Sequence, residues 1–400
     1  MPPGRPGSVM RPQRILLVRD GDFFVHVQQL AELLSRHGHD VEVLHTANAE
    51  PEPLYRELIA DTRRLNIPCH LIHSQAPWLE RKLIALAYTV RAIAKLAVIT
   101  PYKLRMARRV LAARRPFDVV IAYDPSSLYL ACRLFPAQLG TIVDYSLEIS
   151  DESHRDFQTS RTERAFRYFE RSMLPRLGAL MIQDRFRAQV LLQHVPEAAR
   201  ITTIFMAVAI NGPALVQRER PQQPFTVLFF GGLWSDELLQ ELDGVSRALR
   251  EGQVLAIQGG RGTVRPTPRA GSRLVISTEP IPFDRVNQVI ATADVGLAVY
   301  PQAEANSRCS AFASEKVARY LQCGIPFIAF DNEDYAFLRD ETGCCELVRS
   351  YGEIPAAVNS IMDHYERYQR GARAAFEKYY WREAAAPALL RYLEARTPPP

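Results

Sequence analysis

The sequence VGLAVYPQAEANSRCSAFASEKVARYLQCGIPFIAF, residues 295–330, decides the fold. It opens with an unbroken apolar run over 295–300 and closes with a second one over 326–330. Short unbroken apolar runs, as opposed to alternating ones, predict parallel strands that are covered on both faces. The residues between the two runs provide a polar loop and then a helix. The stretch therefore predicts a β-loop-α-β unit, the repeating element of an α/β sheet.

The helix inside this stretch has a recognisable start, face and end. Ser314 is suited to cap its N-terminus, and Gly324 is suited to end it. Val317, Tyr320 and Leu321 recur at a spacing that forms one apolar stripe. Because the preceding loop opens at the carboxyl end of a strand, the free N–H groups of the helix point to where open α/β sheets bind ligands. This arrangement predicts a phosphate site.

The composition is that of a soluble globular protein. The chain has 400 residues, 47% of them hydrophobic, and a formal net charge of +5, which does not by itself indicate nucleic acid. Its 6 cysteines show no metal-ligand spacing, which favours a reduced, cytosolic compartment. The opening MPPGRPGSVMRPQ lacks an apolar core, so we expect neither a signal peptide nor an anchor there.

Apolar runs alternate with helical patterns twice along the chain. From 14 to 205 the alternation predicts a doubly wound parallel sheet whose last strand is 178–182, and a second alternation begins at Phe225. The segment between them is polar, contains proline and has no periodicity, as is typical of a linker. The predicted divisions are a disordered leader over 1–13, an N-terminal domain over 14–205, a linker over 206–224, a C-terminal domain over 225–380, and a C-terminal helix and tail over 381–400.

The most basic segment is 81–115, which contains no Asp or Glu. Its apolar part, 83–100, is long enough to consider as a membrane span. Arg91 and Lys95 lie inside it, and each would cost roughly 2.5–3.5 kcal/mol at a bilayer centre, so spanning is rejected. Two interpretations remain open: the segment lies on an anionic membrane surface, or it forms a core helix pair with a solvated basic face.

Two successive doubly wound halves, a central linker and a helical C-terminus with a Tyr380-Trp381 step together resemble GT-B glycosyltransferases. The C-terminal half is similar to their retaining branch, family 4. The resemblance covers nearly all of 14–395. It is carried by FTVLFFGG (225–232), IPFDRVNQVIATADVGLAVYP (281–301), SEKVARYLQCGIPFIA (314–329) and DYSLEISDE (144–152).

The resemblance implies two Rossmann-like domains facing a cleft, with the C-terminal helix crossing back to the N-terminal domain. It implies a nucleotide-sugar donor in the C-terminal domain, a glycan or lipid-linked acceptor against the N-terminal domain, and no metal or other cofactor. The implied activity is sugar transfer with retention in cell-surface polysaccharide assembly. The expected location is cytoplasmic, with peripheral attachment to an anionic membrane surface through 81–115 as an option, and no nucleic-acid partner is expected.

The resemblance also assigns roles to residues. Gly231 and Gly232 would let backbone approach the donor, and Lys316 with Arg308 would hold its diphosphate, although both cations could be ordinary surface charge. The donor-binding residues are Gly231, Gly232, Ser314, Glu315, Lys316 and Ile281; the catalytic ones are Lys316, Arg308 and Glu148; the acceptor-side ones are Asp20, Gly21, His26 and Asp124.

Three features depart from the family pattern. The family's Glu-x7-Glu pair, whose second Glu accepts the ribose hydroxyls, is replaced by Ala311 and Arg319, and we expect Glu315 to lie on another face of the helix. No Arg or Lys follows the glycine loop over 233–241, and Leu147 stands where relatives often carry His before Glu. A second hypothesis is therefore a catalytically inactive partner or glycan-binding protein. A nucleotide-sugar epimerase is a third, but the chain lacks a dedicated carboxylate and His set for it.

Overall fold

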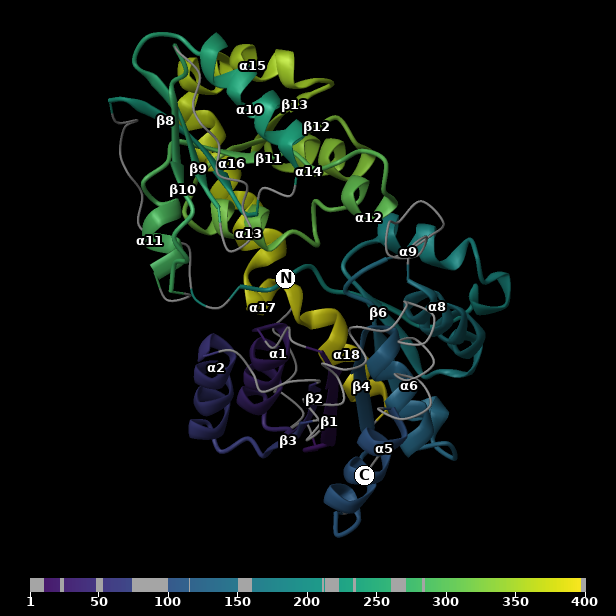
Figure 1. Ribbon diagram of the computed structural model, residues 1–400. Helices are drawn as coiled ribbons and strands as arrows, with labels where there is room; N and C mark the ends of the chain where they lie inside the picture. Colours follow the sequence, from purple (N-terminus) through teal and green to yellow (C-terminus); the bar gives the residue numbers. More distant parts are fainter. Residues whose placement is uncertain are drawn as a thin grey trace, which may run out of the picture. The chain divides into compact units, whose positions relative to one another are not determined.

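The chain forms two α/β units in the computed structural model (Figure 1). One unit is Met1–Met206 with Ala386–Pro400, and the other is Ala207–Ala385. Each unit is described by itself. The structure describes residues 11–21, 25–47, 53–73, 100–114, 116–149, 160–210, 212, 223–232, 235–259, 271–282 and 285–396.

The N-terminal unit contains a 7-stranded sheet of order β3-β2-β1-β4-β5-β6-β7, in which every pair is parallel. The chain winds outward from β1 in one direction and from β4 in the other, so the topological switch point lies between these two strands. The strands are β1 Arg14–Asp20, β2 Asp40–Ala47, β3 Cys69–His73, β4 Val119–Tyr123, β5 Ile142–Tyr145, β6 Ala179–Ile182 and β7 Thr203–Phe205.

The prediction that 178–182 is the last strand of this half is wrong, because β7 adds one more at the sheet edge. β7 has only 3 residues, of which Ile204 alone is fully buried. A strand this short gives no periodicity that a sequence can reveal. It is held through its neighbour: Leu180 donates its N–H to the carbonyl of Thr202, and Met206 donates to Ile182, both at 2.9 Å.

Helices cover the N-terminal sheet, and the last of them comes from the far end of the chain. Figure 1 shows helix α18 in yellow at the C-terminal end of the chain. Its Leu389 and Leu393 are fully buried, and Gln13 donates its side-chain N–H to the carbonyl of Leu393 at 2.7 Å. The predicted return of the C-terminal helix to the N-terminal domain is thus confirmed. The helices are α1 Val25–Arg36, α2 Pro53–Arg64, α5 Thr100–Leu111, α6 Asp124–Leu134, α8 Arg161–Met173, α9 Arg185–Leu192 and α18 Pro387–Arg396.

The C-terminal unit contains a 6-stranded parallel sheet of order β10-β9-β8-β11-β12-β13, with its switch point between β8 and β11. The prediction of two doubly wound α/β domains is therefore confirmed. The strands are β8 Phe225–Phe230, β9 Gln253–Gln258, β10 Leu274–Ser277, β11 Val295–Ala298, β12 Phe327–Phe330 and β13 Cys345–Val348. The helices are α10 Asp236–Ala248, α11 Val286–Ile290, α12 Ala305–Arg308, α13 Glu315–Gln322, α14 Glu333–Thr342, α15 Ile354–Asp363, α16 Tyr365–Ala375 and α17 Arg382–Ala385.

Two apolar clusters cover this sheet. Helices α10 and α15 supply one cluster, which includes Leu297 of β11, and helices α11, α13 and α14 supply the other, which includes Ala298. Neighbouring residues of a strand point to opposite faces, so the clusters lie on opposite sides of the sheet. This two-sided burial explains why the strands have unbroken apolar sequences. Cys344 and Cys345 are buried with free thiols, as small apolar residues would be.

One glycine lets helix α13 lie close to the central strand. A Cβ at Gly296 would lie 2.4 Å from the ring of Tyr320, nearer than real atoms approach. The Tyr320 hydroxyl donates to the carbonyl of Leu228 and accepts from the N–H of Phe230, both at 3.0 Å. Gly296 thus makes room for a ring that ties α13 to β8.

We predict that Gly296→Ala lowers the free energy of unfolding by about 1–3 kcal/mol, because the ring must move and its hydroxyl bonds are strained. The matched control is Gly244→Ala in helix α10, where an added Cβ meets nothing within 4 Å. That change is expected to be neutral or stabilising by up to about 1 kcal/mol, since alanine favours helix. Urea unfolding of the three proteins checks both. Equal effects at the two glycines would contradict the packing argument.

Candidate functional site

The first candidate site lies in the C-terminal unit, at the carboxyl ends of β8 and β11. Gly231 follows β8 with φ +134°, and a Cβ there would lie 3.4 Å from Cε of Lys316. Its N–H is already used, since it donates to the carbonyl of Gln258 at 3.0 Å. The contribution of Gly231 to the site is therefore the space beside Lys316, because its N–H is not available to a ligand. Gly232 comes next, and residues 233–234 lie outside the described residues.

The N-terminus of α13 begins at this site. The Ser314 hydroxyl accepts a hydrogen bond from the N–H of Val317 at 3.2 Å, so the predicted N-cap is confirmed. The hydroxyl of Tyr300 lies 2.5 Å from the same Ser314 oxygen. The cap is thus fixed from the strand side as well, and the first turn of the helix faces the switch point in one orientation.

Lys316, in the first turn of α13, is the most unusual group of this site. Its Nζ lies 4.2 Å from the centre of the Phe229 ring and 4.7 Å from that of the Tyr300 ring. Among the described residues no carboxylate or hydrogen-bond acceptor contacts it. Burial lowers its pKa to about 7. An ammonium stabilised only by ring faces is suited to bind an anion that supplies the missing negative charge.

Arg308 and Ile281 make contacts that support the structure around the site. Nη1 of Arg308 donates to the carbonyls of Gln302 and Ala303, at 2.9 and 3.0 Å. It therefore holds the loop that follows β11, and among the described residues it has no carboxylate partner. Ile281 is partly buried and packs against the apolar cluster on the α13 side of the sheet.

The expectation that Glu315 lies on another face of the helix than Arg319 is wrong. Arg319 donates to Glu315 Oε1 from Nη2 at 2.6 Å and from Nε at 2.8 Å. Residues four apart turn through 400°, so they end only about 40° apart on the helix surface. Nη1 of Arg319 donates to Asn287 Oδ1 at 3.0 Å. The guanidinium therefore orients the neighbouring carboxylate.

Ala311, the other position where the family pattern has Glu, lies in the core. It is fully buried, its N–H donates to Asp334 Oδ2 at 2.7 Å, and its carbonyl accepts from the Tyr380 hydroxyl at 2.6 Å. A larger, charged side chain would have to displace this packing. The loss of glutamate at 311 is thus part of how this unit is packed.

The second candidate site lies in the N-terminal unit, at the carboxyl ends of β1 and β4. Asp20 Oδ1 accepts from Lys103 Nζ at 2.5 Å and from the Thr46 hydroxyl at 2.7 Å. Lys103, on α5, has only 2% of its side chain exposed. This cation of the basic segment is therefore a buried counterion, unlike a residue of a solvated face. Sequence could not reveal the pair, since 83 positions separate its members.

Gly21 and His26 stand on either side of residues 22–24, which lie outside the described residues. Gly21 has φ +123°, which favours glycine, and its N–H donates to the carbonyl of Thr46 at 2.9 Å. Nε2 of His45 lies 2.7 Å from the Gly21 carbonyl oxygen. The carbonyl of His26 accepts from the Tyr123 hydroxyl at 3.4 Å, and its side chain is partly exposed.

Asp124 links three strand ends of the N-terminal sheet. It has φ +62°, an uncommon conformation for a residue other than glycine. Its Oδ2 accepts from Arg19 Nη1 at 2.5 Å, and its Oδ1 accepts from the N–H groups of Leu147 and Glu148 at 2.9 and 3.2 Å. The Glu148 side chain is exposed. The carboxylate of Asp124 therefore positions the segment that presents Glu148.

A buried acid lies in the neighbouring strand. Asp144, in β5, is fully buried, and no ion pair or hydrogen bond to a cation balances its carboxyl group among the described residues. Burial, followed by the nearby Glu170 carboxyl, raises the pKa of Asp144 well above its ordinary value. Glu170 is itself fully buried and pairs with Arg167 at 3.3 Å. Asp144 therefore keeps its proton in the folded chain at pH values where it is ionised in the unfolded chain.

The sequence did not identify several residues that contact the predicted site residues. Arg19, Lys103 and Tyr300 were not assigned to a site, yet each contacts a residue that was. Arg19 and Tyr300 had a usable signal, because each stands at or just beyond the carboxyl end of a strand next to its switch point. Lys103 had none.

Residues 25–205 match a family model described as a Glycosyl transferase 4-like domain. No curated protein matches the sequence. Among solved structures, the chain is similar to the sucrose-phosphate synthase of Thermosynechococcus elongatus, with a TM-score of 0.63 and 15% identity over 96% of this chain and 100% of that one.

Two further structures have similar coverage. HepE of Anabaena, solved with UDP and glucose, has a TM-score of 0.62 and 11% identity over 96% of this chain and all of its own. WaaG, a glycosyltransferase involved in lipopolysaccharide biosynthesis, has a TM-score of 0.56 and 12% identity over 95% of this chain and 98% of its own. At such identities the likeness shows the fold, which is that of GT-B glycosyltransferases.

The state of Asp144 generates a pH prediction. Its folded-state pKa is raised, so unfolding releases a proton, and the free energy of unfolding falls as the pH rises from about 4 towards the folded pKa. Asp144→Asn keeps the shape and removes this term. We predict that the variant becomes more stable than the parent as the pH is raised from 4.5 to 7.5.

Denaturant unfolding at a series of pH values measures this difference, with the exposed Glu197→Gln as the control that should not alter the pH dependence. A stability difference between Asp144→Asn and the parent that stayed constant with pH would show that Asp144 is ionised in the folded chain.

Proposed function

We propose that the chain is a GT-B glycosyltransferase that moves a sugar from a nucleotide-sugar donor to a glycan or lipid-linked acceptor. The transfer proceeds with retention and without a metal, in the assembly of a cell-surface polysaccharide on the cytoplasmic side of a membrane. The fold and the match over 25–205 support sugar transfer, and the fold neighbour HepE has been solved with UDP-glucose. The observation that carries the proposal is Lys316, at the switch point of the C-terminal sheet, whose amine lies against two ring faces and contacts no carboxylate among the described residues.

In this proposal Lys316 binds the diphosphate of the donor. Negative charge develops on the leaving phosphate as the glycosidic bond breaks, and a fixed cation together with the N–H groups of the α13 N-terminus stabilises that charge. Gly231 leaves the space beside Lys316 that the phosphate needs. Arg308 holds the loop after β11, so its contribution is to position this side of the site.

Glu315 is suited to accept the ribose hydroxyls. Arg319 bonds to Oε1 of Glu315 through two nitrogens, which fixes the carboxylate and leaves Oε2 for a ligand. The acceptor is assigned to the N-terminal unit, where Asp124 holds the backbone that presents Glu148. Asp20 is paired with Lys103, so in this proposal it maintains the shape of the loop that contacts the acceptor.

We predict that the purified protein binds one of the UDP-, GDP- or dTDP-sugars saturably, and that Lys316→Ala weakens this binding roughly tenfold or more, about 1.4 kcal/mol. The affinity of the parent should also fall above pH 7, by up to about tenfold per pH unit, because the amine must gain a proton to bind the diphosphate. Titration calorimetry at pH 7, 8 and 9 measures both effects.

The pH dependence should be flatter in Lys316→Ala. The control is Lys378→Ala, an exposed lysine paired with Glu341 in the same unit, which should bind as the parent does. Release of free nucleoside diphosphate with a glycan acceptor, in the presence of EDTA, tests transfer without a metal. Absence of binding to every donor would refute the proposal.

The second candidate is a catalytically inactive glycosyltransferase-like partner or glycan-binding protein. It is favoured by Ala311, whose buried position leaves no room for the first glutamate of the family pattern, and by Arg319, which reverses the charge where the ribose-binding glutamate is expected. Absence of binding across the whole panel of nucleotide sugars would support this candidate over the enzyme.

Membrane attachment is the remaining part of the proposal. Residues 81–99 lie outside the described residues, and none of the described helices is long and apolar enough to cross a membrane. On α5, Arg105, Arg108 and Arg109 have exposed side chains, and the last two follow each other at the helix end. This basic surface is suited to anionic lipid headgroups.

We predict that the protein sediments with vesicles containing an anionic phospholipid and not with neutral ones. Replacing Arg105, Arg108 and Arg109 by Glu should abolish sedimentation, since each cation near an anionic surface contributes about 1 kcal/mol. The control reverses Arg247 and Arg250 of the other unit, one partly and one well exposed to solvent. Unchanged sedimentation of the triple variant would favour the solvated-face interpretation.

A further inference from the structure

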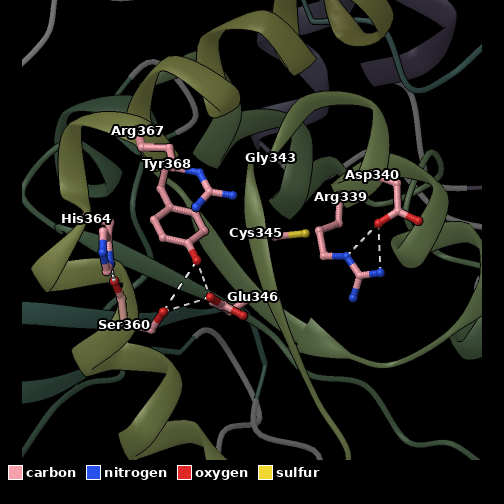
Figure 2. Close-up of a pocket in the computed structure, with 9 residues that line it drawn as sticks. All are labelled: Arg339, Asp340, Gly343, Cys345, Glu346, Ser360, His364, Arg367 and Tyr368. Carbon is pink, nitrogen blue, oxygen red and sulfur yellow. Dashed lines mark hydrogen bonds and ion pairs between the residues drawn. The ribbon is translucent and has the colours of Figure 1, made fainter.

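The C-terminal unit contains a polar pocket of about 650 Å³ that the proposed function does not use. It lies at the edge strand β13, where this strand begins, between the end of α14 and the start of α16 (Figure 2). Gly231 and Lys316 lie at the carboxyl ends of the strands of the same parallel sheet. The pocket is therefore at the other end of the sheet from the candidate donor site.

Two arginines from different helices line the pocket, on either side of Cys345 (Figure 2). Arg339, of α14, pairs with Asp340 at 2.7 Å, but that carboxylate has 66% of its side chain exposed, so the pair is a weak surface one. Arg367, of α16, lies over the ring of Tyr368 at 5.6 Å and has no carboxylate partner among the described residues. Both guanidinium groups add positive charge to the pocket, and a guanidinium is suited to bind a phosphoryl group.

The opposite wall contains a carboxylate held in one orientation. Oε1 of Glu346 accepts hydrogen bonds from the Ser360 hydroxyl, at 2.9 Å, and from the Tyr368 hydroxyl. Figure 2 shows the second oxygen of Glu346 pointing away from both of these donors. A carboxylate oxygen presented in this way accepts hydrogen bonds from hydroxyl groups, whereas the Tyr368 ring beside it is buried in the core and serves to hold the carboxylate.

We propose that this pocket binds a small phosphorylated sugar, with the phosphoryl group on Arg339 and Arg367 and a sugar hydroxyl on Glu346. The volume lies within the range of small-molecule sites and exceeds the size of a hexose phosphate. The polar lining excludes an apolar ligand. The ligand bound here leaves the candidate donor site free, so the two sites can be occupied together.

Calorimetric titration with glucose 6-phosphate, glucose and inorganic phosphate tests the proposal. Glucose 6-phosphate should bind saturably and at least tenfold more tightly than either of the other two. Arg367→Gln should weaken its binding at least tenfold. The matched control is Arg370→Gln, an exposed arginine of the same helix that pairs with Glu366 and does not line the pocket. It should bind as the parent does.

Two further variants separate recognition from structure. Glu346→Gln keeps the oxygen that accepts from Ser360 and Tyr368, so the fold is retained, and the preference for glucose 6-phosphate over inorganic phosphate should disappear. A purely structural role would lower the melting temperature and leave that preference unchanged. Lys316→Ala should leave glucose 6-phosphate binding intact.

The proposal is overturned if glucose 6-phosphate does not bind saturably, or if inorganic phosphate binds as tightly. It is also overturned if Arg370→Gln weakens binding as much as Arg367→Gln. Loss of binding in Lys316→Ala would place the ligand at the donor side and refute the separate site.

Discussion

The hydroxyl of Tyr320 is the contact on which the candidate donor site depends. It joins α13 to the central strand β8 through the carbonyl of Leu228 and the N–H of Phe230, and Gly296 makes room for its ring. The helix axis is thereby fixed against the strand ends. The first turn of α13, with Ser314 and Lys316, follows rigidly from that contact, because a short helix transmits its orientation along its whole length.

The two candidate sites differ in how their charged side chains are paired. In the C-terminal unit Lys316 lies against aromatic rings and has no counterion among the described residues, so its ammonium group can pair with an anionic ligand. In the N-terminal unit Asp20 and Asp124 already have their cations, Lys103 and Arg19. An unpaired charge that is removed from water lowers stability, so it is retained where binding requires it. A paired charge instead holds neighbouring segments in position. This contrast favours the C-terminal unit as the side that binds an anionic donor.

The contacts of Ala311 and Arg319, at the two positions where the resemblance predicts glutamate, show how packing and chemistry compete. Ala311 donates its N–H to Asp334 and accepts from Tyr380, so the backbone at this position belongs to the core. Arg319 became the partner of Glu315 on the same helix face, four residues away. A carboxylate is therefore still present near the first turn of α13, at a position one helical turn before the usual one. A mismatch with a family pattern at single positions therefore does not show which chemical groups a site contains.

The local sequence by itself determined the α/β fold class and the Ser314 cap, whereas the return of the C-terminal helix to the first domain was implied by the resemblance. The fold class and the cap follow from unbroken apolar runs and capping chemistry, which are readable within a few neighbouring residues. Only the tertiary structure decided which charges are paired. The contacts of Lys103 with Asp20 and of Arg19 with Asp124 join residues 83 and 105 positions apart. The pocket of Arg339, Glu346 and Arg367 likewise joins two helices and an edge strand. Such contacts depend on which strands are neighbours in the sheet, and the local sequence does not specify that order.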